Sequence, residues 1–344
     1  MTANKHFKRL VRARAARTGQ SYTTALHHLH HLRPTPAPPA TPAAPGEPKR
    51  VRLAVAQSTV RDDPRSEAEL RESGREVRRL MREARAAGAR IVHFPEGATC
   101  APGKRVLSVD GPERVGAADW ERFAWHVLRQ ELSATAELAR ELGLWVVLGS
   151  VHRLTAPHRP HNSLYVISDQ GQLVTRYDER LLSHTKISYL YAPGSAPVTF
   201  EVDGVRFGCL LGMEVHFPEL FGAYERLDVD VVLFSSTGGA PDDGGVFATE
   251  AQGHAATNGY WVSFSVPAQL SHSAPAGVVA PSGRWLARCP QDGTPAVVVV
   301  DLDEGSADVE VAVFRARPWR RTARDGVYDP HFVADPRSED RRAF

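Results

Sequence analysis

From residue 51 onward, short apolar segments alternate with longer amphipathic ones, and this order constrains the fold more than any other feature of the chain. Apolar runs predict β-strands at 51–57, 89–94 and 144–148, whereas 66–87 and 117–142 have apolar residues at helical spacing. Strand–helix–strand units of this kind place strands side by side with helices packed outside them. The chain is therefore predicted to be an α/β protein.

The second half of the chain adds hairpins to this pattern. Polar turns at 169–172 and 203–204 each separate two apolar segments, which predicts hairpins over 162–177 and 198–211. Further strands are predicted at 229–235, 261–266, 277–280 and 296–301, with a helix at 249–258. Together these segments predict two mixed sheets with helices on their outer faces.

The composition is that of an ordinary globular protein. Hydrophobic residues make up 42% of the 344 residues, which suits one large α/β domain or two small ones, and no run of about 18 apolar residues predicts a membrane span. The N-terminal residues lack the apolar stretch of a secretory signal. Cys100, Cys209 and Cys289 are widely spaced, which favours reduced thiols and a cytoplasmic protein. No cofactor or metal is expected.

Charge divides the chain into two unlike parts. Residues 1–50 contain nine Lys or Arg residues and one acidic residue, whereas the whole chain carries a net charge of only +2. We expect a basic helical or disordered tail at 1–33, a Pro/Ala-rich linker at 34–50, a domain at 51–320 and a C-terminal tail at 321–344. The basic tail either contacts an acidic partner, nucleic acid or an anionic membrane surface, or stays solvated.

Several short segments along the domain occur in an order that is typical of one family. They are Phe-Pro-Glu-Gly at 94–97, Val-Leu-Gly-Ser at 147–150 with His-Asn-Ser at 161–163, Tyr-Ala-Pro-Gly at 191–194, Phe-Pro-Glu-Leu at 217–220, 254–262, and Pro-Ser-Gly at 281–283. In these segments the chain resembles the nitrilase (carbon–nitrogen hydrolase) superfamily over roughly residues 50–320. The resemblance implies an α-β-β-α sandwich, with helix pairs outside two sheets, and a homodimer.

The resemblance also assigns places to the family's Glu–Lys–Cys triad. In that triad the cysteine attacks an amide or nitrile carbon, the glutamate moves the proton and the lysine stabilises the oxyanion. Glu96 matches the glutamate, but Glu179 stands at the place of the lysine and Gly212 at the place of the cysteine. The resemblance therefore implies the family's fold without its usual catalytic Cys and Lys.

Neighbouring residues are candidates to replace the missing groups. Lys186 follows Glu179 by seven residues, and a loop either brings it into the pocket or leaves it on the surface. Cys209 lies three residues before Gly212, so a regular strand would point its thiol to the opposite face, into the core. If Glu96 and Glu179 meet in one pocket, the pKa of one carboxyl group should rise. The candidate catalytic residues are Glu96, Glu179 and Lys186.

Four positions are candidates for ligand binding. Gly212 leaves room in the pocket, and His152 falls near the place of a second glutamate that many family members have. Glu214 matches the family's acidic residue just after the nucleophile, where it either holds local structure or binds a substrate cation. His216 stands where the family often has arginine, and it either contacts a ligand or is a hydrogen-bonded structural histidine.

Three functions are compatible with this pattern. The first is a protein that binds a small amide- or amine-bearing molecule, with non-covalent or lost catalysis. The second is an active amidohydrolase that uses Glu96 with an activated water or another nucleophile. The third is a non-catalytic structural or regulatory subunit that acts through the tail at 1–33 or a dimer surface. Replacing Gly212 by Cys together with Glu179 by Lys is predicted to create a thiol that reacts at neutral pH.

Overall fold

The computed structural model describes residues 12, 21–22, 50–238 and 244–336. Contacts group the chain into two units, residues 1–47 and residues 48–344. Nearly all of the predicted tail at 1–33 and linker at 34–50 lies outside the described residues. The described fold is that of the second unit.

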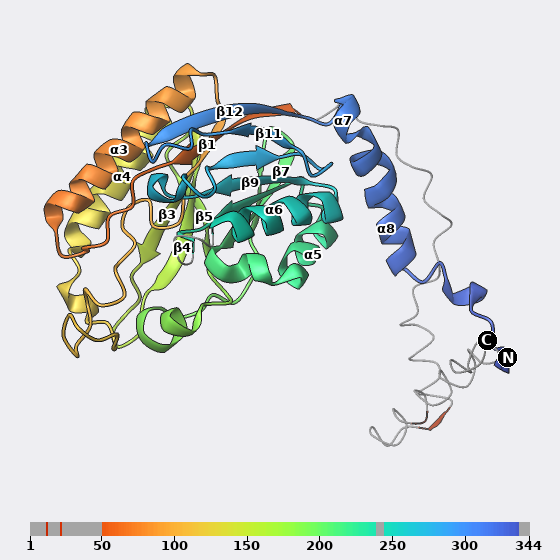
Figure 1. Cartoon of the computed structure of the whole chain (residues 1–344), viewed down its shortest axis with the longest axis horizontal. Coiled ribbons are helices and arrows are strands. Elements are labelled where there is room, and N and C mark those ends of the chain that lie inside the picture. Colours follow the sequence, from red (N-terminus) through yellow and green to blue (C-terminus); the bar gives the residue numbers. More distant parts are fainter. Residues whose placement is uncertain (1–11, 13–20, 23–49, 239–243, 337–344) are drawn as a thin grey trace. The chain divides into compact units, whose positions relative to one another are not determined.

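Two six-stranded sheets form the centre of this unit (Figure 1). The first has the strand order β12-β1-β2-β3-β4-β5, in which β1, β2 and β3 are parallel and the remaining neighbours are antiparallel. Its strands are β1 (Arg50–Gln57), β2 (Ile91–His93), β3 (Trp145–His152), β4 (His161–Ile167), β5 (Leu173–Asp178) and β12 (Ala296–Asp303).

The second sheet repeats this plan, with the strand order β11-β10-β9-β8-β7-β6. Here β7, β8 and β9 are parallel, and the outer neighbours are antiparallel. Its strands are β6 (Thr199–Val202), β7 (Val205–Leu211), β8 (Val231–Ser235), β9 (Trp261–Ser265), β10 (Gly277–Val279) and β11 (Trp285–Arg288).

A pair of helices packs on the outside of each sheet, which confirms the predicted α-β-β-α sandwich (Figure 1). Helices α3 (Glu67–Ala86) and α4 (Trp125–Leu142) share a buried apolar cluster with the first sheet. Helices α5 (Pro218–Arg226) and α6 (Gly244–Asn258) contribute to the larger cluster around the second sheet. The two parallel triplets thus lie inside the sandwich, where both faces of each strand are covered.

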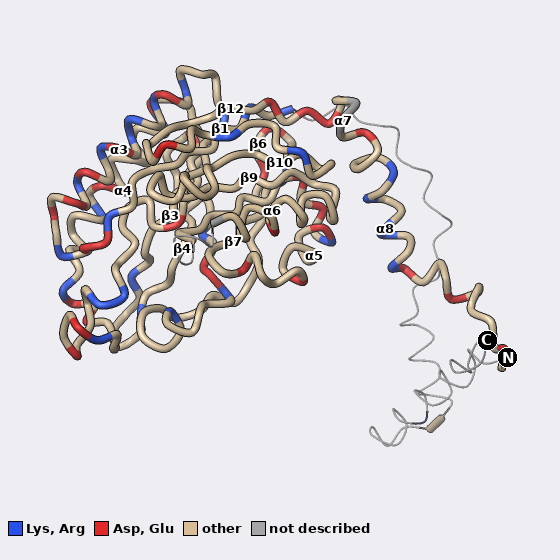
Figure 2. The backbone as a smooth tube through the Cα atoms, in the orientation of Figure 1, with Lys and Arg blue, Asp and Glu red and all other residues tan. Residues whose placement is uncertain are grey.

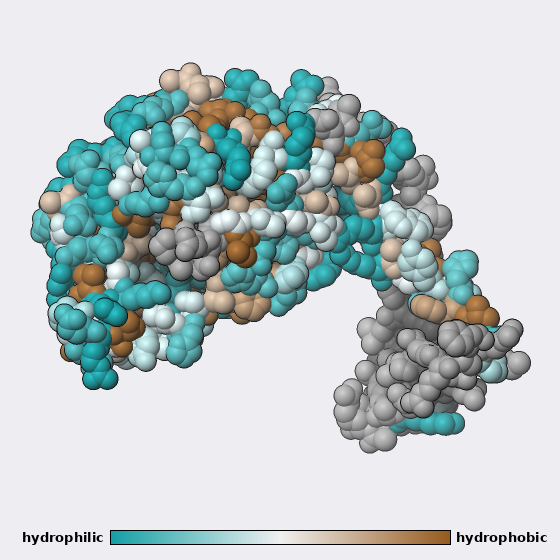
Figure 3. All heavy atoms as spheres, viewed as in Figure 1, coloured by the Kyte–Doolittle hydropathy of each residue, from teal (hydrophilic) through white to brown (hydrophobic). Residues whose placement is uncertain are grey.

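The sequence of α3 explains its position. The side chain of Ser66 accepts a hydrogen bond from the backbone N–H of Glu69 at 3.3 Å, which caps the helix N-terminus. Leu70, Val77 and Leu80 fall on one face and are buried. Figure 2 shows acidic and basic residues along the helix, and Figure 3 shows that the surface over this part is largely hydrophilic.

The contact between the two sheets includes polar links. The imidazole of His93 on β2 lies 2.9 Å from the hydroxyl of Ser263 and 2.6 Å from that of Ser235, both on the second sheet. Ser235 also donates to the carbonyl of Phe94 at 2.9 Å. A similar bond joins Ser265 on β9 to the carbonyl of Ala56 on β1 at 2.7 Å. The side chains of His93, Ser235 and Ser265 therefore each have a hydrogen-bond partner across the sandwich.

Some predicted boundaries were wrong. The helix predicted at 117–142 begins at Trp125, because residue Ala118 pairs with Ser108 in a short bridge and 120–122 form a separate 3₁₀ turn. The helix predicted at 249–258 begins earlier, at Gly244. Helix α5 and strand β11 were not predicted, because each is short and follows directly on a turn.

The C-terminal segment crosses the predicted boundary at 320/321. Arginines attach helix α8 (Arg317–Arg324) to α5 and to the loop that follows α5. Arg317 donates to the carbonyl of Val229 at 2.7 Å, and Arg324 forms an ion pair with the buried Glu225. None of the helices in the described part of the chain combines the length and the apolar character needed to cross a membrane.

Candidate functional site

The candidate residues meet at one end of the sandwich. Glu96 follows β2, Asn162 is the second residue of β4, Glu179 follows β5, Gly212 follows β7 and Thr237 follows β8. In α/β sheets ligands bind at the carboxyl ends of parallel strands, because the chain leaves each strand there in an adaptable loop. The first sheet thus supplies three of these residues and the second sheet two.

Lys186 lies between the two carboxyl groups. Its Nζ is 2.5 Å from Oε1 of Glu96 and 2.7 Å from Oε2 of Glu179. The lysine begins a π-helical turn (Lys186–Leu190), which is part of the loop after β5. Of the two places expected for Lys186, the structure shows the one inside the pocket.

Glu96 has hydrogen-bond donors on all sides. Its Oε1 accepts from Lys186 and from Nδ2 of Asn162 at 2.8 Å, and its Oε2 accepts from the backbone N–H and hydroxyl of Thr237 at 2.8 and 3.2 Å. A carboxylate has about four acceptor positions. Those of Glu96 are therefore occupied, and the carboxylate is fixed between the two sheets.

Glu179 is satisfied on one oxygen only. Its Oε2 accepts from Asn162 at 2.6 Å and from Lys186. Its Oε1 is buried, and among the described residues it has no hydrogen-bond partner. The side chain is fully buried. Of the two carboxyl groups, Glu179 is thus the one with an oxygen that is not hydrogen-bonded to a described residue.

The electrostatics distinguish the two carboxyl groups. Burial alone would raise the pKa of Glu96, but the charge and hydrogen bond of Lys186 hold it below its ordinary value. Burial raises the pKa of Glu179 to about 8, because the attraction of Lys186 does not offset it. Burial would lower the pKa of Lys186, yet the two carboxyl groups raise it. The lysine therefore favours the ionised form of Glu96, whereas burial favours the protonated form of Glu179.

Gly212 faces this cluster at close range. A Cβ atom at this position would lie 2.5 Å from Oε1 of Glu179 and 2.9 Å from Nζ of Lys186. Its φ of 57° is in the left-handed region, which favours glycine. The positions of Glu179 and Lys186 therefore require a residue without a side chain at 212.

Two members of the cluster, Glu96 and Lys186, line a cavity of about 880 Å³, whereas Glu179 does not. Glu96, Asn162, Lys186 and Gly212 contribute to its wall. The other lining residues are Val60, Asp62, Ala101, Pro102, Gly103, Lys104, Ser183, Leu190, Tyr191, Met213, His216, Thr237, Gly238, Phe247, Pro267, Gln269 and Leu270. A volume of this size, with a few converging polar groups, suits a small-molecule ligand.

Glu214 is a fully buried anchor beside the cavity. Its carboxylate accepts from the hydroxyl of Tyr177 and from the backbone N–H groups of Arg180, Leu181 and Leu211, at 2.7–3.2 Å. It does not line the cavity. Of its two expected roles, these contacts match the one of holding local structure, because they fix the loop after β5 to the end of β7.

The two candidate histidines lie in different places. His216 lines the cavity, with its Nδ1 2.7 Å from Glu250. His152 does not line it, because its ring nitrogens face the hydroxyl of Tyr165 at 2.7 Å and the guanidinium of Arg176 at 2.8 Å. His152 therefore lies outside this cavity, and its role in ligand binding stays a prediction.

The cysteines are packed in the interior, as predicted for Cys209. Cys100, Cys209 and Cys289 are free and buried. Burial raises the pKa of the Cys209 thiol above its ordinary value. In the described part of the chain no group of three or more His, Cys, Asp or Glu side chains is arranged to hold a metal.

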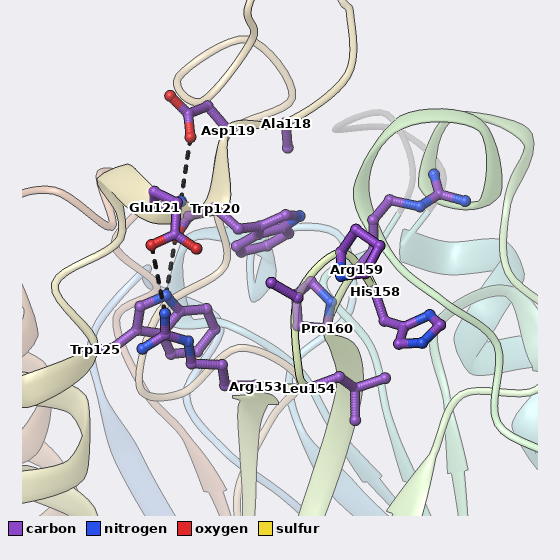
Figure 4. A pocket seen from close by; sticks show the side chains of 12 residues that line it. Ala118, Asp119, Trp120, Glu121, Trp125, Arg153, Leu154, His158, Arg159 and Pro160 are labelled. Carbon is purple, nitrogen blue, oxygen red and sulfur yellow. Dashed lines mark hydrogen bonds and ion pairs between the residues drawn. The ribbon is translucent and has the colours of Figure 1, made fainter.

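A second, smaller cavity of about 190 Å³ lies beside the turn that carries Lys186 (Figure 4). Its wall includes Trp120, Trp125 and Arg153, and the Arg153 guanidinium lies 5.3 Å from the centre of the Trp125 ring. The indole N–H of Trp120 donates to the carbonyl of Leu190 at 2.9 Å. This bond holds the end of the π-helical turn in place.

Asn162 and Thr237 were not predicted as site residues. Asn162 belongs to one of the family segments, so its place in the sequence was a usable signal. Thr237 precedes an irregular stretch without periodicity, and only the three-dimensional structure brings its N–H to Glu96.

Comparisons with known proteins agree with this fold. The family model described as carbon-nitrogen hydrolase matches residues 52–309. Hydrolase MT0498 of Mycobacterium tuberculosis is 27% identical over 199 residues, 55% of this chain and 62% of that protein. The 2-oxoglutaramate amidase of Bacillus subtilis is 27% identical over 109 residues, 31% of this chain and 42% of that protein. The chain thus matches less than two thirds of the length of each relative.

Solved structures show the same architecture. An amidase mutant from Nesterenkonia, a member of the nitrilase superfamily, superposes with a TM-score of 0.59 at 18% identity, covering 82% of this chain and 99% of that one. The glutamine-dependent NAD+ synthetase of Acinetobacter baumannii superposes with a TM-score of 0.57 at 16% identity, covering 74% of this chain and 46% of the synthetase. At these identities the likeness is one of fold.

Proposed function

The chain belongs to the carbon–nitrogen hydrolase family, and from that premise we propose that its cavity binds a small amide- or amine-bearing molecule without forming a covalent bond to it. One observation carries the proposal. Gly212, at the place that the family's nucleophile would occupy, faces Glu179 and Lys186 at distances that leave no room for a side chain. The polar side chains of Glu179 and Lys186 therefore take up the space next to Gly212 that a nucleophile side chain would need.

The hydrogen bonds of Glu96 also support binding without catalysis. A general base needs a free lone pair to accept a proton from water. In the cluster each acceptor position of Glu96 faces Lys186, Asn162 or Thr237. The alternative in which Glu96 activates a water for amide hydrolysis is therefore less well supported, although the fold is that of amidases.

A comparison favours amides as first ligands to test. One of the Nesterenkonia amidase structures is a mutant with alanine in place of a cysteine, in complex with butyramide. A protein of this fold therefore holds an amide without that cysteine. We infer the same capacity for this chain, whose cavity includes apolar residues such as Leu190, Met213 and Phe247 beside the polar cluster.

The proposal is tested by measuring binding and turnover together. The protein is titrated with butyramide, butyronitrile and butylamine by calorimetry, and ammonia release is followed in the same mixtures. We expect binding without ammonia release, lost in Lys186→Met and kept in the control Arg85→Met, whose exposed side chain lies on α3 outside the cavity. Ammonia release that Glu96→Gln abolishes would support an active amidohydrolase instead.

The third candidate, a structural or regulatory subunit, has its own readout. Absence of binding and turnover, together with a partner captured only when residues 1–33 are present, would replace the ligand-binding proposal with this one. We propose a homodimer for the ligand-binding protein and for the regulatory subunit alike, because the family resemblance implies it.

A further inference from the structure

We propose that the smaller cavity, beside Trp120 and Trp125, is a second ligand site that binds a neutral aromatic ring carrying a carboxamide group (Figure 4). None of the described residues that line this cavity also lines the larger one. The second site therefore goes beyond the proposed function and does not depend on it. Three features support it: the aromatic wall, the size of the cavity and the charges at its rim.

Packing and hydrogen bonds hold the aromatic wall in place before any ligand binds. The indole N–H of Trp120 donates to the carbonyl of Leu190, and that of Trp125 donates to the carbonyl of Trp120, both at 2.9 Å. Phe123 stacks on Trp125 with 4.2 Å between the ring centres. Both indole N–H groups are thus used internally, and the tryptophans present only ring surface to the cavity. A rigid surface of this kind suits another flat ring, because little conformational freedom is lost when it binds.

The size of the cavity limits the ligand to one ring. Its volume of about 190 Å³ is below the roughly 300–1,000 Å³ that is typical of sites for drug-sized molecules. Leu154 and Pro160 add apolar surface to the wall. A single ring with one polar substituent is therefore the ligand that this space suits.

Arg153 and Glu121 place a donor and an acceptor at the rim. Nη2 of Arg153 lies 3.5 Å from Oε2 of Glu121, a contact that Figure 4 shows beside the Trp125 ring. Hydrogen bonds between charged groups usually span about 2.7–2.9 Å, so this pair is loose. The guanidinium has five N–H bonds, and Glu121 is the only carboxylate that it contacts among the described residues. Each side chain can therefore form a further hydrogen bond.

A carboxamide matches this pair of groups. Its carbonyl oxygen is an acceptor for Arg153, and its N–H₂ group is a donor for Glu121. The two side chains are 48% and 75% exposed, so a ligand reaches them without displacing the core. The attached ring then lies toward the tryptophans.

The charges of the wall disfavour ionised ligands. Apart from His158, the charged residues of the wall are two acids and two arginines: Asp119, Glu121, Arg153 and Arg159. Their formal charges cancel. A carboxylate in place of the carboxamide would be repelled by Glu121, and an ammonium would be repelled by Arg153.

The test compares benzamide, benzoate and benzylammonium, which share one ring and differ in charge. Quenching of tryptophan fluorescence gives their dissociation constants, because the described residues that line the larger cavity include no tryptophan. Benzamide is expected to bind about tenfold more tightly than either ion, which is the effect of losing one hydrogen bond to a charged group. An excess of butyramide, which lacks the ring, should not displace benzamide.

Two substitutions at the exposed rim test the pair without disturbing the core. Arg153→Met keeps a long side chain over Trp125 but removes the donor, so benzamide should bind about tenfold more weakly. Glu121→Gln removes the negative charge, so benzoate should gain about tenfold and bind as tightly as benzamide. The matched control is Arg288→Met, because the Arg288 guanidinium lies 4.6 Å from the centre of the Trp285 ring, outside both cavities. This variant should leave all three constants unchanged.

The outcomes separate this site from the proposed function. Equal constants for the three ligands, or no quenching by any of them, would overturn the second site whatever the larger cavity binds. Benzamide that butyramide displaces, and that binds Arg153→Met normally, would place the aromatic amide in the larger cavity and also overturn the second site. Benzamide binding that is weakened in Arg153→Met, in a protein that does not bind butyramide, would support the second site and contradict the proposed function alone.

Discussion

A Cβ atom on Gly212 would lie 2.5 Å from Oε1 of Glu179. This distance is shorter than any ordinary contact between a carbon and an oxygen, so a side chain at 212 displaces the buried carboxyl group. Gly212, Glu179 and Lys186 are therefore packed against one another, and a substitution at one of them is expected to shift the side chains of the other two.

Gly212→Ala is expected to destabilise the protein. The left-handed backbone at φ 57° alone costs about 1–2 kcal/mol for a residue with a Cβ, and displacement of Glu179 adds to it. The control is Gly253→Ala on α6, where no described atom lies within 4 Å of the added Cβ and about 0.5–1 kcal/mol of stability should be gained. Urea unfolding measures both. Equal stability of the two variants would contradict the packing described for Gly212.

Lys186→Met is expected to cost about 3–5 kcal/mol at pH 7, because it leaves two buried carboxyl groups without their cation. Without the lysine, burial raises the pKa of both groups above their unfolded values, so the variant should regain stability as the pH falls toward 5. Lys104→Met should change the free energy of unfolding by less than about 0.5 kcal/mol. A loss independent of pH would show that the charge of Lys186 is not the cause.

Exchanging the two charges should be tolerated better than changing either one. Glu179→Lys places a second ammonium beside Lys186, and Lys186→Glu collects three carboxyl groups. The double variant restores opposite charges, and a double-mutant cycle should give a coupling of about 1–3 kcal/mol. The thiol expected from Gly212→Cys with Glu179→Lys therefore also needs Lys186→Glu. In that triple variant, iodoacetamide should label residue 212 faster than the buried Cys209.

His93 should make the protein sensitive to acid. Burial lowers the pKa of His93 to about 3, below the unfolded value of about 6.5. Its contribution to stability is therefore complete above pH 6.5 and falls by about 1.4 kcal/mol per pH unit as the pH drops toward 3. Between pH 7 and 5, the unfolding free energy of His93→Gln should fall less steeply than that of the wild type. Parallel slopes would show that another group controls the acid sensitivity.

The sequence predicted the fold better than the site. The strand β7 was predictable because an apolar run follows a clear turn signal, and its bounds in the structure, 205–211, are the predicted ones. The site depends on loops. The spacing between Glu179 and Lys186 does not reveal that a π-helical turn directs the lysine back between two carboxyl groups.

His152 shows a second limit of the sequence. It was placed near the site from its position relative to a family pattern, yet β3 carries it to the partners Tyr165 and Arg176 instead. Which side of a strand end faces a cavity depends on the register and on the loops packed above it, and neither is encoded by local periodicity.

His93, whose imidazole contacts Ser235 and Ser263, lies three residues before Glu96 in the chain. Packing between apolar faces fixes their relative position through the shapes of the side chains, and hydrogen bonds add links of defined length and angle. The links therefore lock the lateral position of one sheet on the other. Glu179 and Lys186 belong to one half of the sandwich and Gly212 to the other, so this lock and the Glu214 contacts together fix how the two sides of the cluster face each other.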